Sequence, residues 1–262
     1  MLLFHLLLLV VSTCWSVSGQ GGIPTVPCYG QDCSVTQSTT ESTTELTSES
    51  TTESTTPTST TITPPPGTKQ RTVVFIYKVT QVGQDLFIRG GIDDTIVRPI
   101  CQDDEDAESS TCAISIQTNS LGVGAPWAGY DAWRVGDTKL DWFGVQAGQG
   151  TYMGNPAFGT PLAWTTNTPG KPEYQPLNKW GDANWMVDFD MDCSETENGW
   201  FDLKAFLTNY ASGWEADITQ SPCTGTGADV QPPYSGTKNH MARCGYINRF
   251  SFGTGGCEIN AF

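Results

Sequence analysis

Tryptophans that stand beside carboxylate or amide residues are the feature of this chain with the clearest chemical meaning. Eight of its nine tryptophans lie from Trp127 onward. A sugar ring has apolar C–H faces that stack on an indole, while its hydroxyls need carboxylates or amides as hydrogen-bond partners. Pairs of this composition are Asp141-Trp142, Asn184-Trp185 and Trp214-Glu215. We therefore expect a carbohydrate-binding surface that uses Trp214, Glu215, Trp142 and Asp141.

The same rings could instead fill a core, because large aromatic side chains mostly pack inside proteins. Trp185 and Trp200 lie in segments that alternate like strands, and for these two we expect a core position. Trp214 follows a Ser-Gly turn, where binding and packing fit the sequence equally well. Trp142 and Trp180 lie in loops, which often carry binding residues, so Trp180 joins the candidate ligand-binding residues.

An acidic block between Cys101 and Cys112 is the first candidate for calcium. It contains Asp103, Asp104 and Asp106 but lacks the spaced oxygen ligands and central Gly of an EF-hand. The favoured interpretation is a solvated acidic loop. Loose binding of calcium ions or of a calcium mineral is the alternative, and no other cofactor is expected.

Three aspartates on one predicted strand are the second candidate. Asp188, Asp190 and Asp192 are two residues apart, so their side chains share one face of the strand. Such a face could also hold calcium. A strand face exposed to water is the favoured interpretation.

Catalysis finds little support in the residue pattern. His240 is the one histidine outside the N-terminal apolar run, and no nucleophile elbow accompanies it. Carboxylates are plentiful, but nothing singles out a pair with the spacing that glycoside hydrolysis needs. We therefore expect a protein that is not an enzyme, with a glycoside hydrolase as a remaining alternative.

The first residues predict secretion. An apolar run over residues 2–11, too short to span a bilayer, is followed by the small residues Val17, Ser18 and Gly19. This pattern is typical of a signal peptide over residues 1–19. No second apolar run approaches the length of a membrane span, and we expect an extracellular protein with no membrane partner.

The cysteines predict a disulfide framework. One of the nine, Cys14, lies in the signal peptide, which leaves an even number in an oxidising compartment. Eight thiols permit about 105 sets of pairs. We expect Cys28–Cys33 and Cys101–Cys112 as pairs that close short loops, Cys193–Cys244 across a sheet, and Cys223–Cys257 by elimination.

The charge of the chain excludes two classes of partner. Its formal net charge is −15. All 13 basic residues but only 23 of the 28 acidic ones follow residue 66, which gives −10 for that part (13 − 23). Such a surface repels nucleic acid and anionic membranes, tolerates neutral ligands and attracts calcium.

Composition divides the chain into four parts. After the signal peptide comes a short Cys-containing segment, residues 20–35. Residues 36–66 are rich in Ser, Thr, Glu and Pro, cannot bury a core, and are typical of a disordered, O-glycosylated, mucin-like stalk. Residues 67–262 suit one globular domain.

Short predicted strands separated by turn residues are typical of an all-β fold. A run rich in β-branched and aromatic residues predicts a strand at 72–79, a Gly-Gln turn and a Gly-Gly stop frame a second at 85–89, and further strands are expected at 185–190, 200–208, 214–218 and 245–252. No window shows a sustained helical period, and residues 119–176 have the Gly, Pro and Trp content of long ordered loops. We predict a disulfide-bonded, antiparallel β-sandwich with long ordered loops.

The order of these segments resembles a known module. The stretches RTVVFIYKVTQVGQDLFIRGGID (71–93), LDWFG (140–144), PLNKWGDANWMVDFDMDCS (176–194), GWFDLKAFLTN (199–209), GWEADI (213–218) and CGYINRF (244–250) are similar to the C-terminal accessory module of mollusc and other invertebrate α-amylases. No catalytic barrel accompanies the module here, and residues 94–121 depart from it. A weaker likeness to starch-binding β-sandwich modules implies a sugar site near Phe201, Lys204, Trp214 and Glu215.

These observations lead to one expected function and two alternatives. We expect a secreted, non-catalytic protein that binds a polysaccharide, either an α-glucan or a glycan of the extracellular matrix. An acidic structural component of a calcified matrix, such as shell or skeleton, is the first alternative. A glycoside hydrolase is the second.

Overall fold

The computed structural model describes residues 67–93 and 107–262. The predicted signal peptide, the segment 20–35 and the stalk 36–66 lie outside this range. So do the Cys28–Cys33 pair, Cys101, and the acidic residues Asp103, Asp104 and Asp106.

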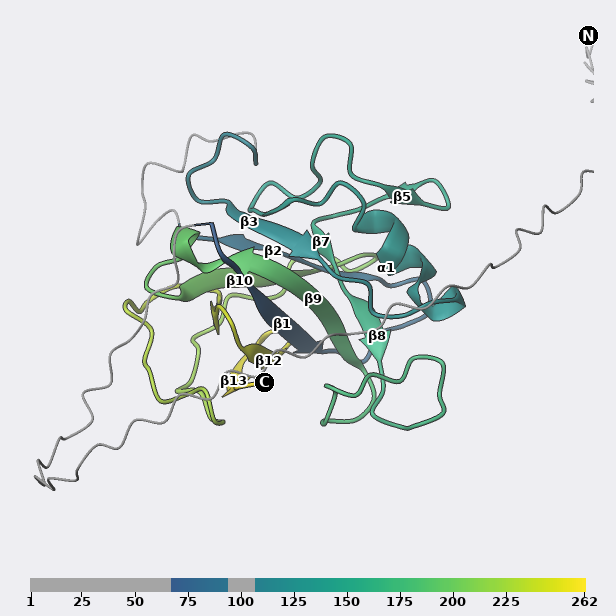
Figure 1. The fold of residues 1–262 in the computed structure, drawn as a ribbon. Coiled ribbons are helices and arrows are strands. Elements are labelled where there is room, and N and C mark those ends of the chain that lie inside the picture. Colours follow the sequence, from purple (N-terminus) through teal and green to yellow (C-terminus); the bar gives the residue numbers. More distant parts are fainter. Residues whose placement is uncertain (1–66, 94–106) are drawn as a thin grey trace, which may run out of the picture. The chain divides into compact units, whose positions relative to one another are not determined.

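The described chain is mostly β-structure, with short helices only (Figure 1). The α-helix α1 (Ala128–Trp133) follows the 3-10 turn η2 (Ala125–Trp127), and a second 3-10 turn, η3, spans Cys193–Glu195. No helix in the described part is long and apolar enough to cross a membrane. The prediction of an all-β fold is confirmed at this level.

Two sheets and one small hairpin make up the domain. The larger sheet has the order β13-β12-β1-β9-β3-β4, with β8 also paired to β9, and the smaller has the order β11-β10-β2-β7. The larger contains β1 (Lys69–Tyr77), β3 (Ile114–Thr118), β4 (Lys139–Leu140), β8 (Ala163–Thr165), β9 (Asn184–Asp192), β12 (Ile247–Ser251) and β13 (Thr254–Asn260). The smaller contains β2 (Leu86–Gly91), β7 (Thr160–Pro161), β10 (Trp200–Leu207) and β11 (His240–Arg243), and β5 (Thr151–Tyr152) pairs with β6 (Asn155–Pro156).

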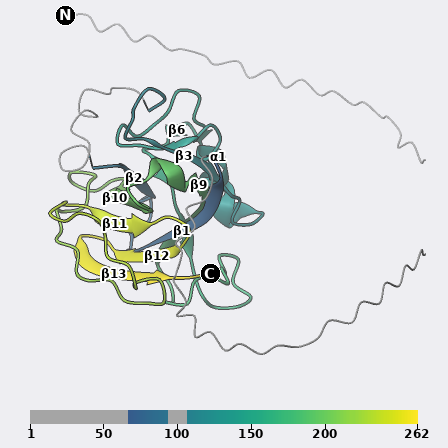
Figure 2. The ribbon, with the colours of Figure 1, turned by 60° about the vertical axis from the view of Figure 1, so that its left-hand side comes forward.

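One strand pair departs from the predicted antiparallel pattern. β1 and β12 are parallel, with Val73 opposite Ile247. These strands lie near the two ends of the domain sequence, so the whole intervening chain provides the long connection that parallel pairing requires. Figure 2 shows β12 beside β13, close to the C-terminus. The other strand pairs of both sheets are antiparallel.

The two sheets share one large core cluster. β1 contributes Val74 and Ile76 to it, and β10 contributes Leu203. Because successive residues of a strand point to opposite faces, Val73 and Phe75 leave that cluster and join a second one on the outer side of the larger sheet. β1 is therefore buried on both faces, which explains its unbroken run of β-branched and aromatic residues.

Most of the predicted strands are present, and one is wrong. The segments 72–79, 85–89, 185–190, 200–208 and 245–252 overlap β1, β2, β9, β10 and β12. Residues 214–218 form no strand, because only Trp214 makes a bridge to β10. The carboxylate of Glu215 then bonds the Ala205 N–H of β10, where a continuing strand would have offered a backbone carbonyl.

Two disulfides fasten the domain, and both are pairs expected from the sequence. Cys193 follows β9 of the larger sheet and bonds Cys244, which follows β11 of the smaller one. Cys223 bonds Cys257 of β13, which holds the loop between β10 and β11 against the edge of the larger sheet. Cys112 is also disulfide-bonded. The tryptophans expected in the core, Trp185 and Trp200, are both buried.

Candidate functional site

An open hollow on the smaller sheet brings together four of the predicted ligand-binding residues. Its volume is about 450 Å³, and we call it the two-tryptophan hollow. The residues that line it are Trp142, Lys204, Trp214, Glu215, Asp217 and Asn239. They come from four separate parts of the chain, so only the folded domain assembles them.

The hairpin that follows β10 sets the position of Trp214. Lys204 and Phe206 are on the face of β10 opposite the core residue Leu203. The turn after β10 closes when the Leu207 N–H donates to the Gly213 carbonyl at 2.7 Å. After this turn the chain runs back antiparallel to β10. Trp214 forms a β-bridge with Phe206, which lies on the same outer face of β10 as Lys204.

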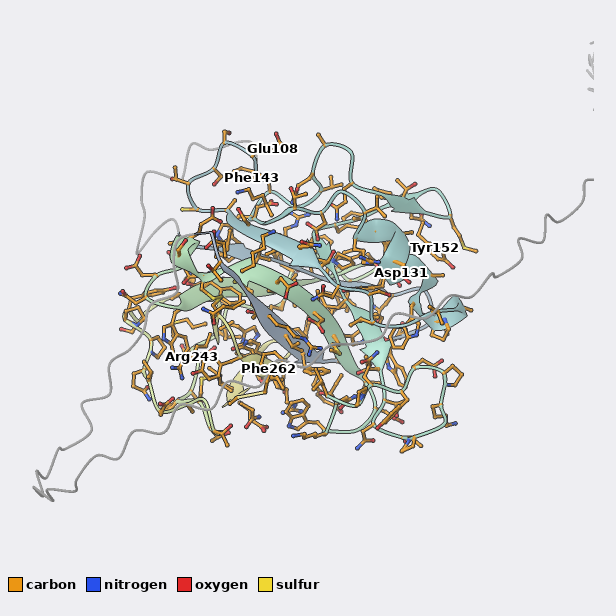
Figure 3. The ribbon with its side chains drawn as sticks, viewed as in Figure 1. Glu108, Asp131, Phe143, Tyr152, Arg243 and Phe262 are labelled. Carbon is orange, nitrogen blue, oxygen red and sulfur yellow. A yellow bond between two sulfur atoms is a disulfide. The ribbon has the colours of Figure 1, made fainter. Side chains whose placement is uncertain are left out.

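The second indole is held by the loop after β4. The Gly90 N–H of β2 donates to the Asp141 carbonyl at 2.9 Å, which ties this loop to the smaller sheet. The indole N–H of Trp142 donates to the Ile92 carbonyl at 3.0 Å. Phe143, the next residue, is labelled in Figure 3 on the same side of the domain as Glu108. Trp142 is thus fixed by its polar edge, and its ring remains half-buried.

Arg89 of β2 supports the Trp214 ring. Its guanidinium carbon lies 5.0 Å from the centre of that ring and 4.9 Å from the centre of Phe206. Cation–π contacts of this kind contribute about 0.5–2 kcal/mol. Arg89 also donates to the Phe158 carbonyl at 2.7 Å. Burial lowers the pKa of Arg89, and the nearby Asp141 partly opposes this effect.

Charged groups form the polar side of the hollow. The Lys204 ammonium donates to Asp217 at 2.6 Å, and Lys238 contacts the other oxygen of that carboxylate at 3.0 Å. The side chain of Lys204 is 14% exposed and that of Asp217 is 56% exposed. The hydrogen bond from Lys204, followed by that from Lys238, lowers the pKa of Asp217. Asp217 is therefore an ionised acceptor open to solvent beside two indoles.

Glu215 has a different role from the one expected. Glu215 is only 3% exposed. One carboxylate oxygen accepts from the Ala205 N–H at 2.7 Å, and the other accepts from the Gly253 N–H at 2.8 Å and lies 3.2 Å from His240 Nε2. These contacts use the carboxylate inside the protein. The expectation that it bonds a ligand hydroxyl is corrected, and Glu215 instead positions Trp214.

Asp141 needs the same correction. It is buried, and one of its oxygens accepts from the N–H groups of Phe143 and Gly144 at 2.7 and 2.9 Å. The other accepts from the side-chain amide of Gln146 at 3.2 Å. Burial raises the pKa of Asp141, and these hydrogen bonds oppose the shift. The carboxylate shapes the loop that carries Trp142 and does not face a ligand.

Trp180 lies apart from the two-tryptophan hollow. It packs on the outer side of the larger sheet, edge to face with Phe75 at 5.1 Å. Its indole N–H donates to Glu258 at 2.8 Å. Phe201, which the starch-binding likeness placed near the sugar, is fully buried in the shared core. Neither residue joins the other candidates.

The strand aspartates do not form a solvated face, which corrects the favoured interpretation. Asp188 is buried and accepts from Arg71 at 2.6 Å and from Asn119 at 3.1 Å. Asp192 caps η3 by accepting from the Ser194 N–H at 3.0 Å. Asp190 is half-buried. Within residues 67–93 and 107–262 no group of three or more His, Cys, Asp or Glu is placed to hold a metal ion.

His240 is part of the core. It is completely buried, stacks on Phe250 with 4.5 Å between ring centres, and bonds Glu215 through Nε2. This environment gives it a structural role behind the hollow.

Three residues of this surface were not found from the sequence. Asp217 and Asn239 line the hollow, and Arg89 lies behind Trp214. Asp217 occurs in the stretch GWEADI, but the adjacent Trp-Glu pair was the stronger signal there. Only the cross-strand pairing of Arg89 with Lys204 brings β2 to this site.

Comparisons with protein families, with curated proteins and with solved structures find no match for this chain. The functional argument therefore depends on the geometry of the site.

Proposed function

We propose that this chain is a secreted, non-catalytic protein that binds a polysaccharide through the two-tryptophan hollow. The observation that carries the proposal is the meeting of Trp142 and Trp214 with Lys204 and Asp217 in one open hollow. We further propose that the domain is a β-sandwich module similar to the accessory module of invertebrate α-amylases. In this proposal residues 36–66 act as a glycosylated stalk.

The chemistry of the hollow suits a neutral sugar. Two half-buried indoles offer apolar surfaces for C–H faces, and each exposed stacking contact is worth about 0.5–1.5 kcal/mol beyond the area it buries. Lys204 offers donors, Asp217 offers an ionised acceptor, and Asn239 offers both. Because the ammonium and the carboxylate neutralise each other, the hollow does not require a charged ligand.

Support from Arg89, Phe206 and Glu215 prepares the site before binding. The Trp214 ring is held from behind, and its neighbour Glu215 is fixed by buried hydrogen bonds. A ring that is already in place loses little conformational freedom when a sugar stacks on it. This pre-organisation offsets the modest energy of each contact.

A retention assay tests the proposal. The full chain is mixed with insoluble starch, chitin and cellulose, and the bound fraction is measured for the wild type and for Trp214→Ala. We expect retention by at least one polysaccharide and a loss of affinity of roughly 2- to 13-fold on substitution, the equivalent of one stacking contact.

Trp180→Ala is the matched control. It removes another half-buried indole, but from the outer side of the larger sheet, and it should leave retention unchanged. Retention by none of the three polysaccharides would contradict the proposal. So would a loss of binding in Trp180→Ala but not in Trp214→Ala.

The two alternatives have their own discriminators. A structural component of a calcified matrix would be recovered from demineralised matrix extracts, and the net charge of −15 is the observation that favours it. A glycoside hydrolase needs two available carboxylates about 5–10 Å apart. Of the two that line the hollow, Glu215 is already bonded by Ala205, Gly253 and His240, so the geometry favours binding.

A further inference from the structure

A second pair of hollows has its own lining residues, and one of the two borders the two-tryptophan hollow through Phe206, which packs against Trp214. One has a volume of about 480 Å³ and the other about 360 Å³. Both are lined by Asp85, Trp133 and Asn155, and neither shares a lining residue with the two-tryptophan hollow. We call the two together the Asp85 groove. Figure 3 labels one of its residues, Tyr152, beside α1.

Aromatic rings line both hollows of this groove. The first hollow is lined by Phe87, Phe158, Phe206 and Tyr210, and the second by Tyr130, Tyr152, Trp164 and Trp185. Two of the indole N–H groups already have protein partners, because Trp133 Nε1 donates to the Asn155 carbonyl and Trp185 Nε1 to the Lys78 carbonyl, both at 3.1 Å. Phe87, Tyr130, Trp133 and Trp185 are buried and form the floor of the groove. The rings with exposed surface are Phe158, Phe206 and Tyr210 in the first hollow and Tyr152 and Trp164 in the second.

Asp85 is the one charged residue among those that line the groove, and its carboxylate is uncompensated. Its main chain is fixed: the N–H donates to Thr208 Oγ1 at 2.7 Å, and the carbonyl accepts from the Thr208 N–H at 2.9 Å. Across the described ranges, no hydrogen bond or ion pair reaches the carboxylate. No Lys, Arg or His lines either hollow.

The surroundings make this carboxylate a good partner for a cation. Asp85 is half-buried, and burial alone raises its pKa, which means that its charge has lost hydration without gaining a partner. Arg89 already lies over the Phe206 ring and Lys78 over the Tyr210 ring, so the faces that can attract a bound cation are those of Tyr152 and Trp164. The net charge of −10 over residues 67–262 (13 − 23) adds a long-range attraction for a positively charged chain.

We propose that the Asp85 groove binds the ammonium group of an amino sugar within a saccharide chain, with neighbouring sugar rings stacked on the aromatic walls. The two hollows meet at Asp85, so a chain could place one ring on each side of the bound ammonium. A bare metal ion fits less well, because one carboxylate supplies too few ligands for calcium. This site shares no lining residue with the two-tryptophan hollow, although Phe206 packs against Trp214, and it does not depend on the function proposed for that hollow.

Oligosaccharides that differ only in charge test the inference. The full chain is titrated at low salt with a glucosamine hexamer and with the N-acetylglucosamine hexamer, which has the same backbone without the ammonium groups. We expect the glucosamine hexamer to bind more tightly, and Asp85→Asn to weaken its binding by about tenfold while leaving the acetylated hexamer unaffected. Added salt should weaken the glucosamine hexamer selectively.

Two further variants keep the test decisive. Tyr152→Ala removes a half-buried wall of the groove and should also weaken the glucosamine hexamer, which provides a second probe if Asp85→Asn does not fold. Trp142→Ala removes the indole of the two-tryptophan hollow that does not contact Phe206, and it should leave this binding intact, so failure of the groove and failure of the proposed function are distinguishable.

Three results would overturn the inference. The first is equal affinity for the glucosamine and N-acetylglucosamine hexamers, and the second is undiminished binding of the glucosamine hexamer by folded Asp85→Asn. The third is binding of a lysine hexamer as tight as that of the glucosamine hexamer, which would mean that the groove binds cationic peptides.

Discussion

Exchanging Glu215 for Gln separates the structural role of this residue from a role in ligand binding. The carboxylate accepts three hydrogen bonds, from Ala205 N–H, Gly253 N–H and His240 Nε2. A Gln side chain has one acceptor oxygen, and its NH2 group would face at least one buried N–H donor. Each donor left without a partner costs about 1–3 kcal/mol, and bonds to a charged acceptor are the stronger ones.

We therefore expect Glu215→Gln to lower the free energy of unfolding by roughly 2–4 kcal/mol. For a domain of this size the corresponding drop in melting temperature is roughly 5–15 °C. Affinity for the retained polysaccharide, measured well below the melting temperature, should fall less than in Asp217→Asn, because the buried carboxylate does not reach the ligand and acts only through the position of Trp214.

Asp217→Asn is the matched partner of this variant, two residues away on the same segment. Its carboxylate is exposed and lines the hollow, so we expect an unchanged melting temperature and several-fold weaker retention. Thermal unfolding by circular dichroism and retention on the polysaccharide give both readouts. The reasoning fails if Glu215→Gln melts with the wild type, or if it loses binding while folded and Asp217→Asn does not.

Three further predictions concern the domain as a whole. Gly213→Ala should lower the melting temperature, because Gly213 has φ +76° and an added Cβ would lie 2.3 Å from the Phe206 ring. The left-handed backbone alone costs an alanine about 1–2 kcal/mol, and Ser212→Ala is the control. Replacing Cys223 and Cys257 by Ser should reduce the free energy of unfolding in urea by about 2–5 kcal/mol, and an unchanged midpoint would show that the loop is held by other contacts. Burial raises the pKa of Asp137 to about 8 and that of Asp202 to about 7. Between about pH 5 and 8 the folded protein therefore keeps protons that the unfolded chain has released, and the free energy of unfolding should fall as the pH rises over this range. Asp137→Asn should make the melting temperature less dependent on pH over this range, and a pH-independent melting temperature in the wild type would contradict the prediction.

Local patterns predicted the strands whose side chains alternate or run uniformly apolar. β1 carries an unbroken run of β-branched and aromatic residues, and β9 and β10 carry closely spaced aromatic and other apolar residues, so their positions follow from composition. The segment 214–218 has similar residues but forms no strand, because a buried Glu215 carboxylate takes the hydrogen bond that a strand would need. α1 was missed because six residues are too few to show a helical period.

The sequence by itself determined the all-β class and an even set of cysteines for disulfides, and it marked Trp142 and Trp214 as candidates. The pairs Cys193–Cys244 and Cys223–Cys257 were expected, and the structure decided them. Residue type and spacing carry this information, since aromatic rings, thiols and β-branched side chains each favour few environments.

Only the tertiary structure decided which carboxylates face water. Glu215 and Asp141 are sealed among backbone N–H groups, while Asp217 and Asp85 are left at open hollows. An aspartate or glutamate has the same charge in either place, and its accessibility depends on which distant strands and turns close over it.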